Sequence, residues 1–221
     1  MRQKTEISII RNFGDQQLIS LNMPVPSIKP GQFFIVYNPE KDDHLNPIYF
    51  TLQLDEIFFL KPKNTNWEIG DQLIVNGPIG SGFSNYFNFQ NLLCISLGQS
   101  CGGLNPVVDH SVSIGKNVAY MLDDANVVLP NSVEIVFPNM LDENLIWADF
   151  VLIEVERDHL EKNQEILKRI LKSDVHTEIL IYCPILCSGD AQCMVCSVKT
   201  KEGWIRTCQQ GTVFNLKELE F

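Results

Sequence analysis

The cysteines of this chain are concentrated near one end. Four of its seven cysteines are Cys187, Cys193, Cys196 and Cys208, which have the spacing C-x5-C-x2-C-x11-C. Several thiolates on a tight loop, completed by a more distant one, are suited to hold an iron–sulfur cluster. The first gap is one residue longer than in the plant-type C-x4-C-x2-C pattern. Gly189 gives the loop the backbone freedom that a close approach to a cluster needs.

Other roles for these cysteines are open. A structural zinc site usually has two C-x2-C pairs, and only Cys193 and Cys196 form one here. The four could also be buried small hydrophobic residues. Disulfides would require an oxidising compartment, which nothing else in the sequence indicates. Cys183 could replace Cys187 as a ligand, but its place after an apolar run fits a buried cysteine at a strand end better. We therefore expect an iron–sulfur cluster in this segment.

Length and charge limit the remaining possibilities. A chain of 221 residues suits one large domain, or two small ones with an appendage. The net charge of −10 argues against binding to nucleic acid, whose phosphates attract basic surfaces. No apolar run approaches the roughly 20 residues of a membrane span, and the N-terminus lacks the apolar region of a signal peptide. We therefore expect a cytoplasmic protein with reduced thiols.

Residues 1–90 have the pattern of β structure. Short runs rich in aromatic and β-branched residues alternate with proline and glycine turns. The expected strands lie at 6–11, 17–21, 32–37, 48–52, 56–60 and 72–75, before a glycine-rich turn at 77–82. Many short strands at close spacing predict a small antiparallel barrel.

Residues 91–182 change to an α/β pattern. The run 91–97 is continuously apolar, as in a buried parallel strand, and it leads into a glycine turn at 98–103. Later strands are expected at 117–122, 132–137, 149–154 and 178–182, with an amphipathic helix at 158–172. This order predicts an abbreviated, Rossmann-like parallel sheet.

Three short motifs, in this order along the chain, resemble a known family. They are Pro30-Gly-Gln-Phe33, Gly70-Asp-Gln-Leu-Ile-Val-Asn-Gly-Pro-Ile-Gly-Ser-Gly-Phe83 and Cys208-Gln-Gln-Gly-Thr-Val-Phe214. The chain resembles the electron-transfer subunits of dihydroorotate dehydrogenase, within the ferredoxin–NADP reductase-like superfamily. The resemblance covers nearly the whole chain. It implies an FAD-binding-type β-barrel at 1–90, a nucleotide-binding-like α/β domain at 91–182 and a C-terminal [2Fe-2S] lobe at 183–221.

The resemblance also implies cofactors and a partner. It assigns the four ligands of the [2Fe-2S] cluster to Cys187, Cys193, Cys196 and Cys208. It further implies FAD, and electron transfer to a separate catalytic flavoprotein such as a dihydroorotate dehydrogenase-like protein. The chain would then be an oxidoreductase subunit that needs a catalytic partner.

The FAD contacts that the resemblance implies lie on two segments. They are Asn46, Pro47, Tyr49 and Thr51 on the first, and Gly77, Gly80 and Gly82 on the second. The family has an arginine where this chain has Asn46, so the pyrophosphate of FAD would rest on backbone N–H groups. Tyr49 could contact the flavin or be a core residue of the barrel. The three glycines could contact FAD or form only a tight turn.

The segment that would bind a nicotinamide nucleotide, residues 91–182, departs further from the family. The turn from Gly98 to Pro106 keeps glycines and a proline but not the spacing typical of NAD(P)H-binding members, and a lone glycine turn is weak evidence. We expect NAD(P)H binding to be weak or lost and Cys101 to be a packing residue. Two functions remain open. The chain passes electrons between FAD and a [2Fe-2S] cluster, or it is a structural or regulatory subunit with a metal-braced docking lobe that has lost flavin and NAD(P)H binding.

Overall fold

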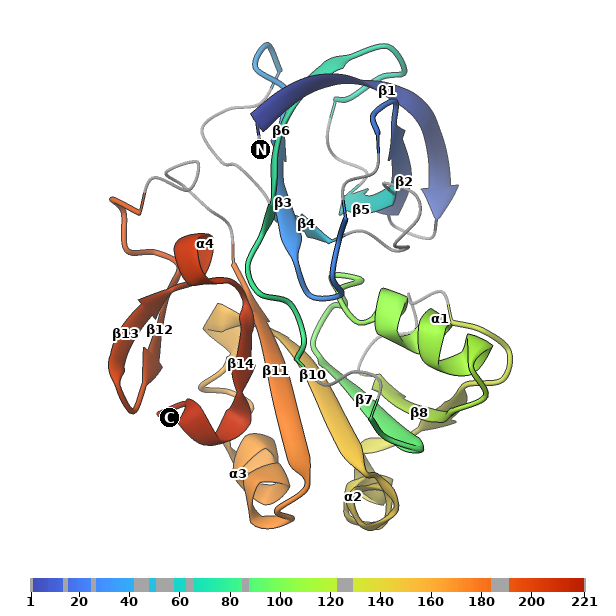
Figure 1. Cartoon of the computed structure of the whole chain (residues 1–221), viewed down its shortest axis with the longest axis vertical. Helices are drawn as coiled ribbons and strands as arrows, with labels where there is room; N and C mark the ends of the chain where they lie inside the picture. The colour runs from blue at the N-terminus through green and yellow to red at the C-terminus, as the bar shows by residue number, and fades with distance from the viewer. Residues whose placement is uncertain are drawn as a thin grey trace.

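The fold is described here from a computed structural model of the chain. The structure describes residues 2–13, 16–24, 27–41, 48–50, 58–62, 66–84, 88–122, 129–183 and 191–220. Within these ranges the strands form two six-stranded sheets and one two-stranded sheet. Figure 1 shows the antiparallel sheet at one end of the molecule and the mainly parallel sheet at the other.

The first sheet is antiparallel and curled, as the sequence predicts. Its strand order is β4-β3-β6-β1-β2-β5. The bounds are β1 (Arg2–Phe13), β2 (Gln16–Leu21), β3 (Phe33–Tyr37), β4 (Ile48–Phe50), β5 (Phe58–Pro62) and β6 (Gln72–Ile79). The long strand β1 pairs with β6 through residues 2–6 and with β2 beyond them, with an irregular register between Ile7 and Ile9. Such irregularities bend a strand and increase its twist, so β1 turns the corner of the half-barrel.

The second sheet is parallel except at one edge. Its order is β14-β11-β10-β7-β8-β9, and only β14 runs antiparallel to its neighbour. The strands are β7 (Asn91–Leu97), β8 (Asn117–Leu122), β9 (Glu134–Val136), β10 (Phe150–Glu156), β11 (His176–Tyr182) and β14 (Val213–Asn215). Both faces of β7, β10 and β11 are buried, which explains why most of their residues are apolar.

The helices cover the two faces of this sheet differently. The helices are α1 (Asn105–Ser113), α2 (Leu141–Trp147) and α3 (Gln164–Lys172), with short 3-10 turns at Pro138–Met140, Arg157–His159 and Leu216–Glu218. Helix α1 lies on the same face as the half-barrel, whereas α2 and α3 pack on the opposite face. Helix α3 begins at Gln164 and is thus shorter than the helix expected at 158–172. Residues 157–163 form a 3-10 turn followed by a hydrogen-bonded turn instead, in which the Asn163 side chain donates to the His159 carbonyl oxygen.

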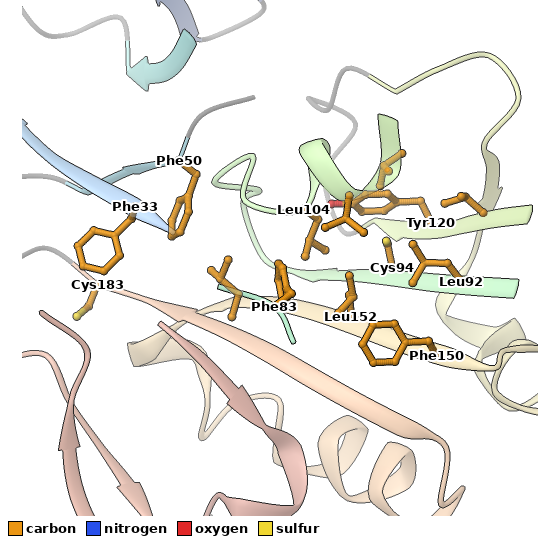
Figure 2. Packing of buried hydrophobic residues seen from close by; sticks show 14 of the residues in the cluster. Phe33, Phe50, Phe83, Leu92, Cys94, Leu104, Tyr120, Phe150, Leu152 and Cys183 are labelled. Carbon is orange, nitrogen blue, oxygen red and sulfur yellow. The ribbon is translucent and has the colours of Figure 1, made fainter. Parts of the chain in front are cut away.

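One hydrophobic cluster joins the two sheets. Phe33, Phe50 and Phe83 of the half-barrel side lie in the same buried cluster as Leu92 and Leu152 of the parallel sheet (Figure 2). The rings of Phe33 and Phe50 are 6.2 Å apart between centroids. Because this core is continuous, the half-barrel is held in a fixed position over the carboxyl ends of the parallel strands.

The C-terminal segment returns to the parallel sheet. After β11 the described chain forms the hairpin β12 (Ser197–Thr200) and β13 (Gly203–Arg206), the short helix α4 (Thr207–Gln210) and then β14. Strand β14 pairs with β11, and Phe214, Leu216 and Leu219 lie in the core beneath α3. A separate C-terminal lobe holding a cluster is not shown in residues 191–220, which are anchored to the α/β sheet instead. No helix within the described ranges is both long and apolar enough to cross a bilayer.

Candidate functional site

Three of the four expected cluster ligands lie in the described residues. Cys196 and Cys208 are buried, with exposed fractions of 1% and 4%, and Cys193 is half-buried. Cys187 lies outside the described residues. The backbone N–H of Thr207 donates to the carbonyl oxygen of Cys196 at 3.1 Å. This bond places the Cys193–Cys196 turn beside the first turn of α4, which carries Cys208.

The backbone of the Cys193–Cys196 turn is unusual. Ala191 and Met194, which flank Cys193, have φ angles of 60° and 61°. A residue with a side chain pays about 1–2 kcal/mol in this left-handed region, and such strain clusters at functional sites. Turns containing left-handed residues can gather backbone N–H groups into a concave anion site, as in many iron–sulfur proteins. The turn therefore has a backbone that fits a cluster.

The ligand set itself does not converge in the described residues. Within them, no three His, Cys, Asp or Glu side chains come together in a group that could hold a metal ion. The donor chemistry and the turn fit an iron–sulfur cluster, while the convergence of its ligands stays a prediction. Cys183 is 4% exposed at the end of β11, which agrees with its expected place as a buried cysteine at a strand end.

The three glycines expected near FAD all contact the chain itself. A Cβ atom on Gly77 would lie 2.6 Å from Phe34 Cδ1, and one on Gly82 would lie 2.6 Å from the Pro30 carbonyl oxygen. A Cβ atom on Gly80 would lie 2.8 Å from Gly211 Cα. The absence of a side chain at these three positions is therefore explained by close packing within the protein. Their contact with FAD stays a prediction.

Of the other four residues expected near FAD, the structure describes only the backbone of Tyr49. Asn46, Pro47 and Thr51 lie outside the described residues. The backbone of Tyr49 belongs to β4 and pairs with Phe34 of β3. Phe50, the next residue, packs in the core between the sheets. Strand β4 therefore brings this segment to the junction between the half-barrel and the parallel sheet.

A buried polar network, which the sequence patterns did not identify, lies at the carboxyl end of the parallel sheet. Glu154 on β10 is 1% exposed. Its Oε1 accepts from Ser96 Oγ at 2.9 Å and from Tyr120 OH at 3.3 Å, and its Oε2 accepts from Cys101 Sγ at 3.2 Å. A glutamate in the interior of a mostly apolar strand was the signal that the sequence offered. Cys101 is thus a hydrogen-bond donor to Glu154 and not only the packing residue that we expected.

Burial, together with Glu154, raises the pKa of two groups that surround this carboxyl group. Burial raises the pKa of the Cys101 thiol well above its usual value, and the nearby Glu154 raises it further. Burial and Glu154 likewise raise the pKa of the Tyr120 hydroxyl. Both groups therefore keep their protons and act as neutral donors to Glu154. Such donors satisfy the buried carboxyl group of Glu154, since burying a polar group without hydrogen bonds is costly.

The network lies at the topological switch point of the sheet. Strands β7 and β10 are parallel neighbours, and Ser96 is directly opposite Glu154 in their register. The chain leaves β7 toward α1 and β8, and it leaves β10 toward α3 and β11, on the other side. Open α/β sheets bind ligands in the crevice outside the carboxyl ends of such strands. Whether this crevice is open to a ligand or filled by the chain's own residues therefore bears on whether the chain binds a nucleotide.

Comparison with known proteins agrees with this architecture. No protein-family model matches the chain. It is 26% identical over 175 residues, 69% of this chain and 68% of the relative, to the dihydroorotate dehydrogenase B (NAD(+)) electron transfer subunit of Clostridium perfringens.

Solved structures show the same fold. The chain superimposes with a TM-score of 0.75 and 18% identity on a structure of NADH-dependent reduced ferredoxin-NADP oxidoreductase, covering 98% of this chain and 89% of that one. It matches the ferredoxin reductase of carbazole 1,9a-dioxygenase with a TM-score of 0.61 and 15% identity, over 79% of this chain and 66% of that one. It matches the ferredoxin-NADP+ reductase of Plasmodium falciparum with a TM-score of 0.59 and 11% identity, over 82% and 96%. The resemblance indicated by the sequence motifs is confirmed: the chain is similar to a dihydroorotate dehydrogenase electron transfer subunit and has a ferredoxin–NADP reductase-like fold.

Proposed function

We propose that this chain is an electron-transfer subunit that carries FAD and a [2Fe-2S] cluster for a partner oxidoreductase. The relative from Clostridium perfringens, itself an electron transfer subunit, supports the function. The observation that carries the cluster is the strained turn around Cys193, which lies beside Cys196 and the α4 residue Cys208.

Each part of the chain has a proposed role. Residues 1–90 form the FAD-binding half-barrel, residues 91–182 the α/β domain, and residues 183–221 the cluster segment. Cys187, Cys193, Cys196 and Cys208 would hold the cluster, and Asn46, Pro47, Tyr49, Thr51, Gly77, Gly80 and Gly82 would lie near FAD. FAD, when bound, would accept two electrons and release them one at a time. The cluster would carry one electron at a time.

The protein's own contribution is to fix positions and exclude water. The continuous core between Phe50 and Leu152 holds the half-barrel against the sheet. Strand β14, which follows Cys208 closely, ties the cluster segment to β11. Two cofactors bound to these parts would therefore keep a constant separation. The catalytic step on substrate would belong to a separate flavoprotein subunit, such as a dihydroorotate dehydrogenase-like protein.

The experiment that tests this function is an anaerobic visible spectrum of the purified chain, with iron, sulfide, zinc and released flavin measured. We expect about two iron and two sulfide per chain, as in a [2Fe-2S] cluster, together with FAD. Cys196→Ser and Cys208→Ser should lose the iron. Cys94→Ser is the matched control, because Cys94 is equally buried but lies in β7. Zinc without iron, and no flavin, would contradict the proposal and support the structural or regulatory subunit.

A further inference from the structure

We infer that this chain exchanges electrons with protein-bound redox centres and not with a nicotinamide dinucleotide, because its own side chains and backbone fill the dinucleotide crevice. The inference rests on the proposed electron-transfer function and names the class of partner for it. Three independent features of the crevice carry it: the buried network around Glu154, the covered glycine turn, and the start of α1.

The first feature is the charge at the switch point. Glu154 places a carboxyl group beside Ser96, and two more carboxyl groups follow in the chain, Glu156 at the end of β10 and Asp158 in the next turn. A dinucleotide would bring its negative pyrophosphate to this edge, since the crevice lies outside the carboxyl ends of the strands. Arg157, the cation in this segment, is engaged elsewhere. Its Nε donates to the Ser197 carbonyl oxygen at 2.8 Å.

The second feature is the glycine turn after β7, in which Gly98 and Gly103 are closely contacted by other parts of the chain. A Cβ atom on Gly98 would lie 2.9 Å from Nδ1 of His159, so the imidazole ring packs directly on this glycine. The hydroxyl of Tyr182 donates to the Gln99 carbonyl oxygen at 2.6 Å. In dinucleotide-binding turns, glycine allows the pyrophosphate to approach the backbone closely. Here His159 occupies that approach at Gly98.

The far end of the same turn is covered in the same way. A Cβ atom on Gly103 would lie 2.7 Å from Leu180 Cδ1 and 3.4 Å from the ring of Phe50. Glycine at this position therefore makes room for residues of β11 and β4. The backbone N–H of Gly102 is also engaged, because it donates to Ser100 Oγ at 3.1 Å.

The third feature is the N-terminus of α1. A helix start normally offers unpaired N–H groups to a phosphate. Here the N–H of Asn105 donates to the Gly102 carbonyl oxygen at 3.3 Å, and the N–H of Val107 donates to the Leu104 carbonyl oxygen at 3.0 Å. Pro106, between them, has no N–H group. The first turn therefore has few donors left for a pyrophosphate.

These features leave protein partners as the source and destination of electrons. A nicotinamide delivers a hydride, which is two electrons in one step, and it must lie in contact with its acceptor. A partner protein with a one-electron centre instead loses one electron for each electron that this chain gains. Such a transfer does not require a dinucleotide crevice.

The test compares the two kinds of donor on the full chain with its cofactors. NADH and NADPH are titrated by calorimetry to about 1 mM, the upper end of typical KM values. The Clostridium perfringens relative, named for NAD(+), serves as the positive control. We expect no binding of either nucleotide to this chain. In anaerobic absorbance measurements, reduced ferredoxin should bleach the visible bands of the chain, whereas NADH and NADPH should not.

The outcomes separate this inference from the proposed function. Binding of NADH or NADPH with a Kd in the micromolar range, or bleaching by either nucleotide, overturns the inference and leaves electron transfer in place. Failure of reduced ferredoxin to bleach the bands overturns the assignment of a protein donor. A chain that contains neither flavin nor iron contradicts the proposed function, while the calorimetric titration still tests whether the crevice is closed.

Discussion

Gly80 and Gly211 pack backbone to backbone, so that the turn after β6 lies directly on the segment between α4 and β14. A Cβ atom on Gly80 would lie 2.8 Å from Gly211 Cα, and one on Gly211 would lie 2.7 Å from Gly80 Cα. Next to this contact, Thr212 Oγ1 donates to the Gly31 carbonyl oxygen at 3.1 Å. The contact joins the half-barrel to the tail that follows Cys208, and thus to the proposed cluster segment.

Alanine at either glycine should destabilise the protein strongly. Gly80 and Gly211 have φ angles of +95° and +106°, so alanine adds backbone strain to the steric clash. We expect a loss of about 2 kcal/mol or more in the free energy of unfolding, measured with urea. Gly70→Ala is the matched control. Its φ is +92°, but no atom lies within 4 Å of the added Cβ, so only the strain applies. Equal losses at Gly70 and Gly80 would contradict the packing argument.

A second link between the sheets runs from Ser84 to Glu178. Glu178 on β11 is 5% exposed and accepts from the Ser84 backbone N–H at 3.0 Å and from the Ser84 hydroxyl. Ser84→Ala removes one donor to a buried carboxylate, and a hydrogen bond to a charged group contributes about 1.5–3 kcal/mol. We expect a loss of this size in urea unfolding. Ser8→Ala is the control, because the Ser8 hydroxyl bonds to Ser20 of β2 at an exposed position of β1. A loss no larger than that of Ser8→Ala would contradict the role of this link.

The prediction from sequence succeeded where local patterns decide the structure. The six strands of the half-barrel were expected from short β-branched runs, and all six are present. The apolar run 91–97 forms β7 with both faces covered. These elements are set by side chains close in the chain, so periodicity and turn residues are sufficient to find them.

The prediction failed where distant residues decide the structure. Glu154 lies in the interior of a mostly apolar strand, and its donors come from β7, from β8 and from the turn at Cys101. His159 covers Gly98 across the sheet edge. No local pattern reports such contacts. The weakened glycine spacing suggested a change at the nicotinamide side, which stays a prediction, and it gave no indication of which residues contact this turn.

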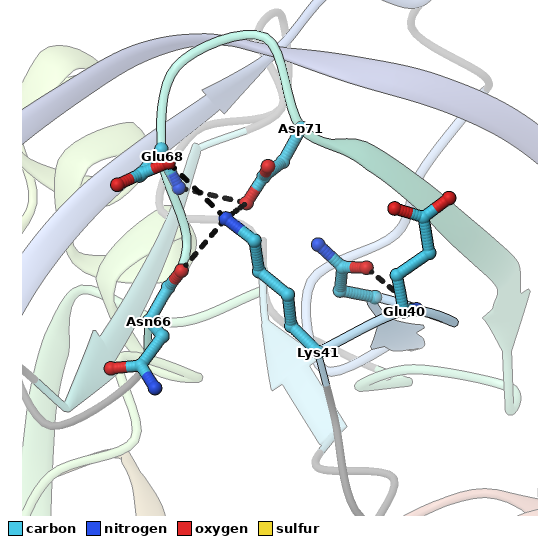
Figure 3. A network of polar contacts seen from close by, with 6 residues as sticks. Glu40, Lys41, Asn66, Glu68 and Asp71 are labelled. Atoms are coloured by element: carbon cyan, nitrogen blue, oxygen red, sulfur yellow. Dashed lines mark hydrogen bonds and ion pairs between the residues drawn. The ribbon is translucent and has the colours of Figure 1, made fainter.

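The ion pair between Lys41 and Asp71 should make stability depend on pH at both extremes (Figure 3). Lys41 Nζ lies 2.9 Å from Asp71 Oδ2, which also accepts from the Glu68 backbone N–H. The hydrogen bond that Lys41 donates to Asp71 raises the pKa of Lys41 above 10.5. Burial raises the pKa of Asp71, but the hydrogen bonds from Lys41 and from the Glu68 backbone outweigh it and lower that pKa below 3.8.

The raised pKa of Lys41 and the lowered pKa of Asp71 determine how stability changes with pH. The contribution of Asp71 is present above about pH 4 and is lost as the pH falls through its lowered pKa, whereas that of Lys41 is lost as the pH rises through its raised pKa. Asp71→Asn should therefore make the Tm of the protein fall less steeply between about pH 5 and about pH 2 than in the wild type. Glu68→Gln, whose side chain is 81% exposed, is the control and should change this slope little. Parallel pH profiles for Asp71→Asn and the wild type would rule out the ion pair as the cause.

The hydrogen bond between Cys101 and Glu154 should control the reactivity of this thiol. Burial and the Glu154 charge both raise the pKa of Cys101, so the reactive thiolate is scarce at neutral pH. Glu154→Gln keeps the size of the side chain and removes its charge, which lowers the pKa of Cys101. Below that pKa, alkylation accelerates roughly tenfold for each unit by which the pKa falls.

The measurement is the rate of alkylation of Cys101 by iodoacetamide at about pH 8.5, the usual pKa of a free thiol. The rate is followed by mass spectrometry of the peptide that contains Cys101. Ser96→Ala is the control, because it keeps the charge of Glu154 while removing another of its donors. Equal rates in the wild type and Glu154→Gln would show that burial alone sets the reactivity of Cys101.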